Sequence, residues 1–250
     1  MNVDFKEMNK IIERCKSKAP KANYKCSVCR DLGYVIIPRV GGQPIIKECA
    51  CKNKERLKEE WKNNGFNVEC NDLTLNKFGS SRNKVSRRMK EVAEDYIDNY
   101  EGIQFDKNNS IAFLGEPGVG KTHICTAISL ELLKKGFSPV YFPYRDIVDS
   151  MIDLRIEDKS KYEMKLTRYQ KCNILFIDDL FKGGYTNTEI KILFKIINYR
   201  YVNRLPIIVS SECLSQGLLE VDKAIGSRII EMARTRTLDI VGEEYNQRLC

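Results

Sequence analysis

Nine consecutive residues, "GEPGVGKTH", have the residue types and spacing of a phosphate-binding loop. The pattern G-x-x-x-x-G-K-[ST] begins at Gly115 and ends with Gly120, Lys121 and Thr122, between an apolar run and a helical stretch. In such a loop, backbone N–H groups and the positive end of the following helix surround the phosphates of a nucleoside triphosphate. Lys121 is expected to reach the β- and γ-phosphates, and the Thr122 hydroxyl to bind Mg²⁺. The predicted nucleotide-binding residues are Gly115, Glu116, Pro117, Gly118, Val119, Gly120, Lys121, Thr122 and His123.

An acidic pair ends the apolar stretch "NILFIDDL". A parallel sheet would place this pair beside the phosphate-binding loop, where Asp178 fits the carboxylate that orients Mg²⁺. Asp179 stands where ATPases of this kind often carry a glutamate that polarises the attacking water. Because aspartate is one methylene shorter, we expect hydrolysis that is slow or that needs a partner to complete the site.

Two further segments carry candidate catalytic residues. The run "LPIIVSS" ends in Ser210 and Ser211, at the sheet edge where ligands bind in open α/β sheets. A hydroxyl there, with Ser211 as the candidate, would sense the γ-phosphate or hold the attacking water; the alternative is a plain turn. Arg228, in "AIGSRIIEMAR", is placed to stabilise the charge on a neighbouring subunit's nucleotide, and the alternative is an ordinary surface arginine.

Four cysteines form two close pairs, with Cys26 and Cys29 in "CSVC" and with Cys49 and Cys51 in "CAC". Two such pairs, on a turn and at a hairpin end, suit a tetrahedral zinc site. The only histidine, His123, lies next to the phosphate-binding loop, so the N-terminal ligands must all be sulfur. Four thiolates leave no open position, which predicts a structural Zn²⁺ ion. The alternative is two unrelated buried pairs.

From residue 110 onward, short apolar runs alternate with longer helical stretches. The apolar runs are "SIAFLG", "PVYFPY", "NILFIDDLF", "LPIIVSS" and "TLDIVG". This alternation predicts an α/β fold with a parallel sheet covered on both faces. Upstream, "GYVIIPRVGGQPIIKECAC" is typical of a hairpin that turns at residues 41–42. We predict an N-terminal zinc-binding domain at 1–70, a helical linker at 71–105 and a P-loop core at 106–250.

Charge and composition narrow the functional class. Residues 1–100 carry 21 Lys and Arg against 14 Asp and Glu, whereas the rest of the chain is nearly neutral. This basic part suits an acidic protein surface or a nucleic-acid backbone, and the alternative is a solvated lysine-rich face. With neither a secretory signal nor an apolar stretch of about 18 to 20 residues, we expect a cytoplasmic protein without a membrane partner. GTPase (N-K-x-D) and transporter (L-S-G-G-Q) signatures are absent, and the serine strand with the arginine helix favours an oligomeric ATPase over a small-molecule kinase.

Most of the chain resembles the DnaC/DnaI-type loaders of replicative helicases, which are AAA+ ATPases of the IstB/DnaC-like group. The resemblance is carried by "CSVCRDLGY" with "ECAC", "GEPGVGKTH", "LFIDDL", "IINYRY" and "IGSRIIEM". It implies an AAA+ core without a C-terminal lid, and an N-terminal domain that grips a hexameric DnaB-type helicase. The core would bind ATP and single-stranded DNA and would self-associate, with Arg228 as the arginine finger. In "VYFPYRD", Tyr144 and Arg145 are the candidates for contact with DNA.

The sequence departs from this resemblance at two places. Ser211-Glu212 stands where relatives often have Ser-Asn, and Tyr245-Asn246 stands where some carry Tyr-Arg, with Arg248 the nearby substitute. Two alternatives therefore stay open. The first is an IstB-type transposition helper ATPase, which shares the core but usually lacks the cysteine module. The second is a helicase adaptor that uses ATP as a binding switch with little hydrolysis.

Overall fold

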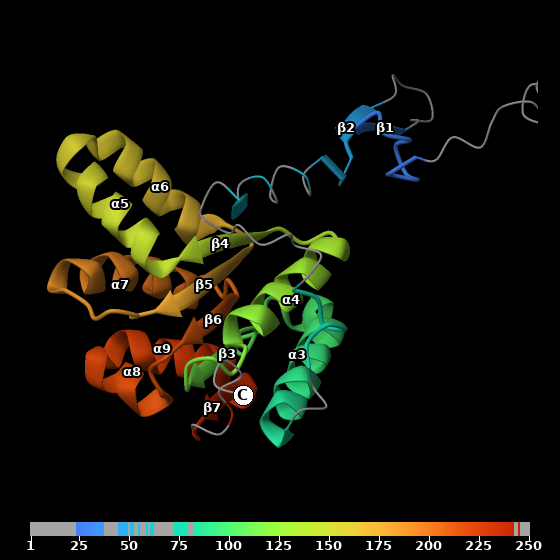
Figure 1. Cartoon of the computed structure of the whole chain (residues 1–250). Coiled ribbons are helices and arrows are strands. Elements are labelled where there is room, and N and C mark those ends of the chain that lie inside the picture. Colours follow the sequence, from blue (N-terminus) through green and yellow to red (C-terminus); the bar gives the residue numbers. More distant parts are fainter. Residues whose placement is uncertain are drawn as a thin grey trace, which may run out of the picture. The chain divides into compact units, whose positions relative to one another are not determined.

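The computed structural model describes residues 24–37, 45–49, 51–52, 55, 59, 61–62, 73–79, 83–242 and 245. The chain divides into two compact units, one up to Asn53 and one from Lys54 onward, and both can be followed in Figure 1. The three-part division predicted from the sequence, including the missing lid, stays a prediction. The predicted turn at residues 41–42 lies outside the described residues, as do Asn246 and Arg248.

The first unit contains a short antiparallel hairpin. Strand β1 (Tyr34–Ile37) pairs with β2 (Ile45–Glu48), and the register places Ile36 opposite Ile46. The two predicted hairpin strands are therefore confirmed. Large apolar side chains are exposed on this unit, namely Val28, Leu32, Ile36 and Ile46. So small and open an element has no hydrophobic core of its own among the described residues, and something else must hold it together.

The second unit is built on a five-stranded sheet. Its strands are β3 (Ile111–Gly115), β4 (Pro139–Pro143), β5 (Ile174–Leu180), β6 (Ile207–Ser211) and β7 (Thr237–Ile240). They lie in the order β4-β5-β6-β3-β7, and every neighbouring pair is parallel. The parallel α/β sheet predicted from the sequence is confirmed. Because parallel strands end at the same edge, this order brings the ends of β3, β6 and β5 side by side.

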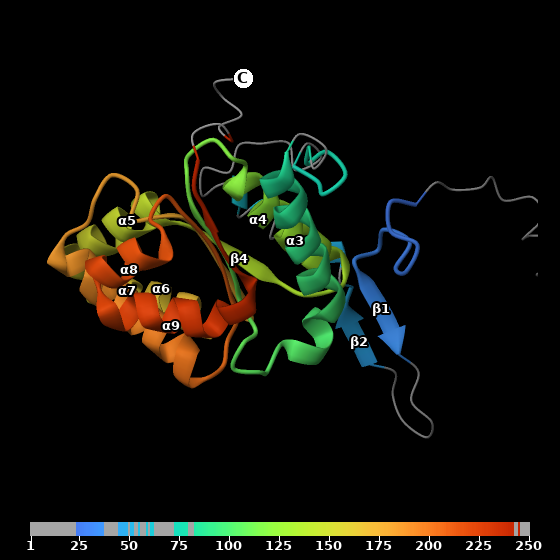
Figure 2. The same ribbon diagram turned by 90° about the horizontal axis from the view of Figure 1, so that it is seen from below.

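Helices cover both faces of this sheet (Figure 2). They are α3 (Lys84–Ile103), α4 (Lys121–Lys134), α5 (Tyr144–Glu157), α6 (Lys159–Lys171), α7 (Asn187–Val202), α8 (Ser215–Val221) and α9 (Lys223–Ala233), with a 3₁₀ turn at Arg234–Arg236. Several begin at a side-chain cap: Asn83 accepts a hydrogen bond from the backbone of α3, and Thr186 forms a capping box with Glu189 at the start of α7.

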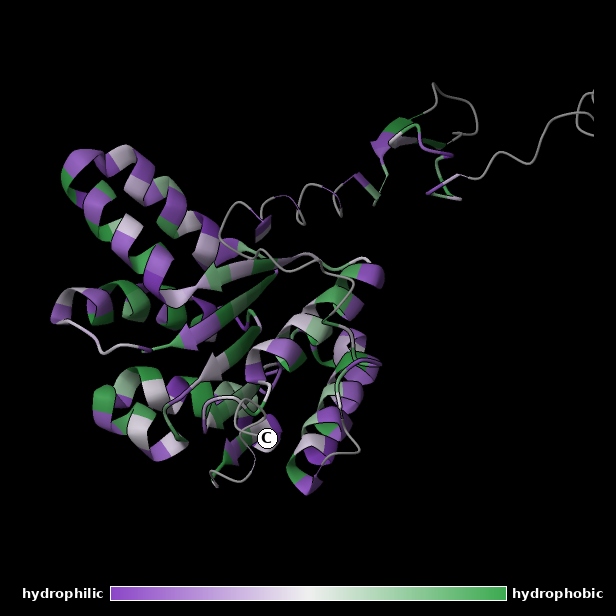
Figure 3. Ribbon diagram, viewed as in Figure 1, coloured by the Kyte–Doolittle hydropathy of each residue, from purple (hydrophilic) through white to green (hydrophobic). Residues whose placement is uncertain are grey.

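Alternating strand residues divide the core into two clusters. One face buries Leu114, Phe142, Leu175 and Val209 against residues of α5, α6, α7 and α9. The other face buries Phe113, Tyr141, Phe176 and Ile208 against residues of α3 and α4. Polar and apolar residues alternate along α5 and α6, as expected of helices with one face toward a sheet (Figure 3). The sheet is thus sealed on both sides, which leaves its carboxyl-terminal edge as the place for a ligand.

The second cluster extends to residues that precede α3. Trp61 is fully buried, and its Nε1 donates a hydrogen bond to the Pro139 carbonyl oxygen at 3.1 Å. Phe78 packs edge-on against the His123 ring, with the ring centres 5.3 Å apart. The segment before α3 therefore belongs to the packed core of the second unit. In the part of the chain that the structure describes, no helix is long and apolar enough to cross a membrane.

Candidate nucleotide site

The phosphate-binding loop joins the end of β3 to the start of α4. Gly115, Gly118 and Gly120 have positive φ angles of 113°, 77° and 94°, a region open to glycine. A Cβ atom on Gly115 would collide with the carbonyl oxygen of Ile240 in β7, and the same oxygen accepts a hydrogen bond from the Glu116 backbone at 3.0 Å. The backbone path of the loop therefore requires the glycines that the sequence motif contains.

Lys121 is the first residue of α4, and its ammonium group lies inside the loop. The residue is 5% exposed, and Nζ donates hydrogen bonds to the carbonyl oxygens of Gly115 at 2.7 Å and Glu116 at 2.6 Å. Burial lowers the pKa of Lys121, and the carboxylates of Glu212 and Asp179 oppose that shift. A buried cation at the positive end of a helix forms a site that attracts anions such as phosphate groups.

At the end of β5, Asp178 is buried and accepts hydrogen bonds from three hydroxyl groups. Its Oδ1 accepts from Thr122 Oγ1 at 2.9 Å and from Ser210 Oγ, and its Oδ2 accepts from the Tyr141 hydroxyl at 3.1 Å. Burial raises the pKa of Asp178, whereas the three hydroxyl hydrogen bonds lower it. A carboxylate beside a threonine hydroxyl supplies the oxygen donors that Mg²⁺ prefers, so this pair fits the predicted metal.

The Asp179 carboxylate has a different partner from that of Asp178. The pairing of β5 with β6 shifts register between Ile177 and Leu180, and Asp179 has a left-handed φ of 54°. Its backbone N–H donates to Ser210 Oγ at 2.9 Å, while its partly exposed carboxylate pairs with Lys182 Nζ at 2.6 Å. The irregular backbone therefore turns the second carboxylate away from the contacts of the first.

Ser211 does not face this site. Its hydroxyl is buried, donates to the Leu180 carbonyl oxygen at 2.7 Å and accepts from the Cys213 backbone at 3.1 Å. Consecutive strand residues point to opposite faces, so Ser210 is the residue that reaches Asp178. The arrangement does not support the sequence-based choice of Ser211 for sensing the γ-phosphate, and Ser210 replaces it as the candidate.

Arg228 lies on α9. Its Nε donates to Asn198 Oδ1 at 3.1 Å and an Nη atom donates to the Ala224 carbonyl oxygen at 2.8 Å. The guanidinium also lies over the rings of Phe194 and Tyr201, 5.4 and 5.3 Å from their centres. Among the described residues, no hydrogen bond or ion pair joins Arg228 to the phosphate-binding loop of its own chain. Its action on a neighbouring subunit stays a prediction.

The two candidates for DNA contact, Tyr144 and Arg145, both make hydrogen bonds within the second unit. Tyr144 is 1% exposed, and its hydroxyl donates to Glu189 at 2.8 Å. Arg145 pairs with the same carboxylate at 3.0 Å and donates to the carbonyl oxygens of Lys182 and Gly184. Because its ring is buried, Tyr144 is not available to stack on DNA, and contact by Arg145 stays a prediction. Arg145 anchors the loop that follows β5.

Tyr141 and Lys182 contact the acidic pair although no sequence motif marks them. Tyr141 meets Asp178 only because β4 is the neighbour of β5, an order that a linear motif does not contain. Lys182 follows Asp179 by three residues, and this spacing is the signal from which an ion pair between them could have been predicted. Both residues also line a cavity of about 390 Å³ beside the two carboxylates, between the ends of β4 and β5.

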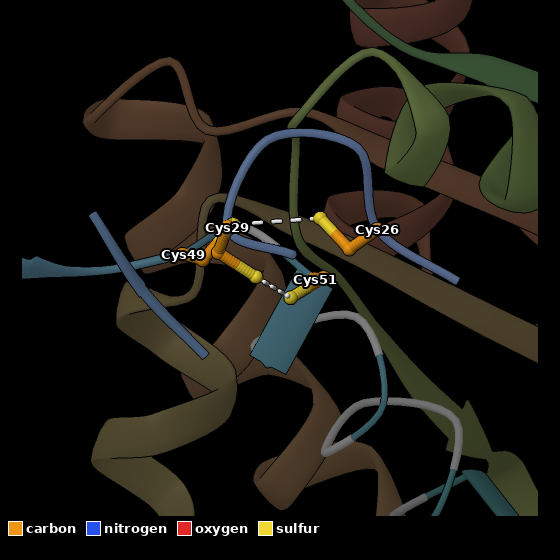
Figure 4. Close-up of side chains that lie close together, drawn as sticks. All are labelled: Cys26, Cys29, Cys49 and Cys51. Atoms are coloured by element: carbon orange, nitrogen blue, oxygen red, sulfur yellow. Dashed lines mark hydrogen bonds between the residues drawn. The ribbon is translucent and has the colours of Figure 1, made fainter. Parts of the chain in front are cut away.

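In the first unit, the four predicted cysteines come together. All four Sγ atoms lie within 4.8 Å of one another, with Cys26 3.8 Å from Cys49 and Cys29 3.4 Å from Cys51 (Figure 4). A tetrahedral zinc ion with Zn–S bonds of about 2.3 Å would separate its sulfur ligands by about 3.8 Å. The number, type and spacing of these donors therefore fit Zn²⁺.

The turn that begins at Cys26 and continues past Cys29 contacts both cysteines. The Asp31 carboxylate accepts from the Cys26 backbone at 2.9 Å, and the Gly33 N–H donates to the Cys29 sulfur at 3.3 Å. Backbone N–H groups of the turn, first that of Cys29, lower the pKa of Cys26 to about 7. The hydrogen bond with the Cys29 thiol raises the pKa of Cys51. The N–H donors of this turn favour the thiolate form of Cys26, which is the form that binds a metal ion.

A five-stranded parallel sheet, with a glycine-rich phosphate-binding loop after one strand and an acidic pair after another, defines an ATPase of the AAA+ class. The family model described as "IstB-like ATP binding protein" matches residues 47–248. The chain belongs to this family, and ATP is its nucleotide.

The chain is similar to several replication and mobile-element proteins. It is 34% identical to the phage-like element PBSX protein XkdC of Bacillus subtilis (strain 168), over 93% of this chain and 89% of that protein. It is 24% identical to the replicative helicase loader DnaC of Escherichia coli (strain K12), over 78% and 67% of the two chains. The crystal structure of DnaI superposes with a TM-score of 0.55 at 24% identity, covering 64% of this chain and 87% of that one.

Proposed function

We propose that this protein is an ATP-dependent loader of a hexameric DnaB-type replicative helicase, which it binds through the unit that carries the cysteine cluster. The observation that carries the proposal is the presence, on one chain, of a four-sulfur cluster and of a phosphate-binding loop whose Thr122 contacts Asp178, together with a helicase loader among its relatives. The cysteine cluster is the feature that favours a loader over the transposition helpers of the same family.

ATP would bind with its phosphates in the loop 115–123, at the positive end of α4. Lys121 would exchange its two carbonyl partners for phosphate oxygens. Mg²⁺, held by Thr122 and Asp178, would neutralise charge on the β- and γ-phosphates. Asp179 would polarise the attacking water once its carboxylate leaves Lys182, and Arg228 would act across the contact between two copies of the chain.

The cysteine cluster would hold a structural Zn²⁺ ion through Cys26, Cys29, Cys49 and Cys51. With all four positions taken by sulfur, the ion would stabilise the fold of the first unit and take no part in catalysis. The exposed apolar residues of that unit, Val28, Leu32, Ile36 and Ile46, would then be available for the helicase.

Single-stranded DNA would bind the core along α6. This helix carries Lys159, Lys161, Lys165, Arg168 and Lys171 and only one acidic residue, Glu163. Four of the five basic residues are exposed. Such a row of cations suits the phosphate backbone of a nucleic acid and predicts binding that weakens as salt is raised.

Co-sedimentation of the full chain with the replicative helicase of the same organism tests the loader function, with ATP, with ADP and without nucleotide. We expect a complex that Cys29→Ser abolishes and Cys213→Ser retains, because Cys213 lies outside the cluster. A wild-type protein that binds ATP but forms no complex under any of these conditions would contradict the proposal.

A transposition helper is the second candidate, because the matching family model is described as IstB-like. In that case the protein would bind its transposase on DNA in the presence of ATP and would ignore the helicase. An adaptor that uses ATP as a switch is favoured by the ion pair between Asp179 and Lys182, which occupies the predicted base. A measurement of ATP turnover with and without the helicase separates the adaptor from the loader.

A further inference from the structure

Both oxygens of the Asp178 carboxylate accept hydrogen bonds, and their donors come from different parts of the fold. Its Oδ1 accepts from Thr122, itself a candidate metal ligand, and from Ser210. Its Oδ2 accepts from the Tyr141 hydroxyl on the neighbouring strand β4. Tyr141 thus restrains the carboxylate from outside the phosphate-binding loop, and this restraint does not depend on the orientation of the Thr122 hydroxyl.

Tyr141 is built to donate this hydrogen bond. Tyr141 is 6% exposed, and its ring packs against Phe176 of β5 with the ring centres 5.2 Å apart. A phenol carries its proton at neutral pH, and the Tyr141 hydroxyl donates it to Asp178 Oδ2 at 3.1 Å. A protonated, packed phenol has little freedom to turn away, and it fixes the plane of the carboxylate that accepts from it.

Trp61 also lies beside the Tyr141 ring. The ring centres are 6.1 Å apart, and the indole N–H donates to the carbonyl oxygen of Pro139, two residues before Tyr141. Trp61 follows Cys51, the last residue of the cysteine cluster, by ten residues. A short stretch of chain therefore separates the predicted zinc site from a side chain that packs behind the Asp178 contact.

We propose that Tyr141 is a positioning residue for the metal-binding carboxylate of Asp178, and that Trp61 extends this positioning to the segment that follows the cysteine cluster. The inference rests on the proposed nucleotide site and goes beyond it. It makes Mg²⁺ binding sensitive to a side chain outside the phosphate-binding loop.

The test measures the Mg²⁺ concentration that half-saturates the ATP-bound full-length protein, compared between wild type and Tyr141→Phe. This variant removes one hydroxyl and keeps the ring. We expect the half-saturating Mg²⁺ concentration to rise about tenfold or more, since a hydrogen bond to a charged group is lost. ATP binding in excess EDTA should stay within about twofold, because the phosphate contacts do not involve Tyr141.

Tyr144→Phe is the matched control. Tyr144 is also buried and also donates to a buried carboxylate, that of Glu189, but Glu189 is not part of the nucleotide site. We expect this variant to keep the wild-type Mg²⁺ dependence. If the half-saturating Mg²⁺ concentration of Tyr141→Phe equals that of wild type and of Tyr144→Phe, the positioning role of Tyr141 is overturned.

Trp61 supplies the second readout, because it is the only tryptophan of the chain. In wild type, we expect its fluorescence to change when Mg²⁺ is added to the ATP-bound protein, and the change to be lost in Tyr141→Phe. No Mg²⁺-dependent change in wild type would overturn the link to Trp61. A wild-type protein that binds no ATP would instead contradict the proposed function, so the two failures are distinguishable.

Discussion

The two units of this protein are stabilised in opposite ways. In the first unit, the buried hydrophobic residues among those described are two cysteines of the cluster, Cys29 and Cys49, while isoleucine and leucine side chains lie exposed. In the second unit, two large apolar clusters cover both faces of a sheet. If the cysteine cluster holds the proposed Zn²⁺ ion, the first unit would depend on that ion for its fold, whereas the second unit has a hydrophobic core independent of its proposed nucleotide.

Removal of zinc should have the largest effect, and it tests whether the two units differ in what stabilises them. A structural Zn²⁺ ion contributes about 10 kcal/mol or more to the folding of small domains, so a strong chelator should unfold the first unit and abolish helicase binding. ATP affinity and Trp61 fluorescence should remain, because Trp61 packs in the second unit. Metal analysis should find one zinc per chain. Loss of ATP binding on chelation would show that the two units do not fold independently.

Lys121→Ala should have the converse effect. The substitution removes the cation of the phosphate-binding loop, and nucleotide affinity should fall by more than about a hundredfold. Zinc content should be unchanged. Lys134→Ala, at the other end of the same helix and exposed beside Glu131, is the matched control and should bind ATP normally. Retention of ATP binding by Lys121→Ala would mean that the loop has been misinterpreted.

Asp179→Asn separates ATP binding from ATP turnover within the second unit. If Asp179 is the base, turnover should fall by about a hundredfold or more. ATP affinity should stay within about twofold, because the Asp179 carboxylate contacts Lys182 and not Thr122. Steady-state turnover with the helicase present, beside equilibrium ATP binding, measures both quantities. Unchanged turnover would assign the base to another residue.

Asn83→Ala is the smallest of these changes and tests the stability of the second unit alone. Its side chain accepts a hydrogen bond from the Ser86 backbone at 2.7 Å at the start of α3. Loss of this cap should lower the free energy of unfolding by about 1 kcal/mol, measured by denaturant unfolding followed through Trp61. Zinc content and helicase binding should not change. A loss of zinc in this variant would be unexpected, since α3 belongs to the other unit.

Much of the second unit could be predicted from the sequence because its signals are local. The alternation of apolar runs and helical stretches predicted the parallel sheet, and the phosphate-binding loop has a fixed spacing. The contacts of Tyr141 and Ser210 could not be predicted, because they depend on strand order and on which face each residue points to. The stretch "IINYRY" carries part of the resemblance, and the structure shows a packing role for it: the fully buried Arg200 donates to carbonyl oxygens such as those of Tyr169 and Pro206.

The place of β7 in the sheet has a consequence for the synthesis of the protein. Its residue Ile240 closes the back of the phosphate-binding loop by accepting from Glu116 and lying against Gly115. More than a hundred residues separate the two sides of this contact in the chain. A nascent chain on the ribosome therefore cannot complete its ATP pocket until translation has passed residue 240. Until then, the nascent chain contains all four cysteines of the cluster but cannot form the ATP pocket.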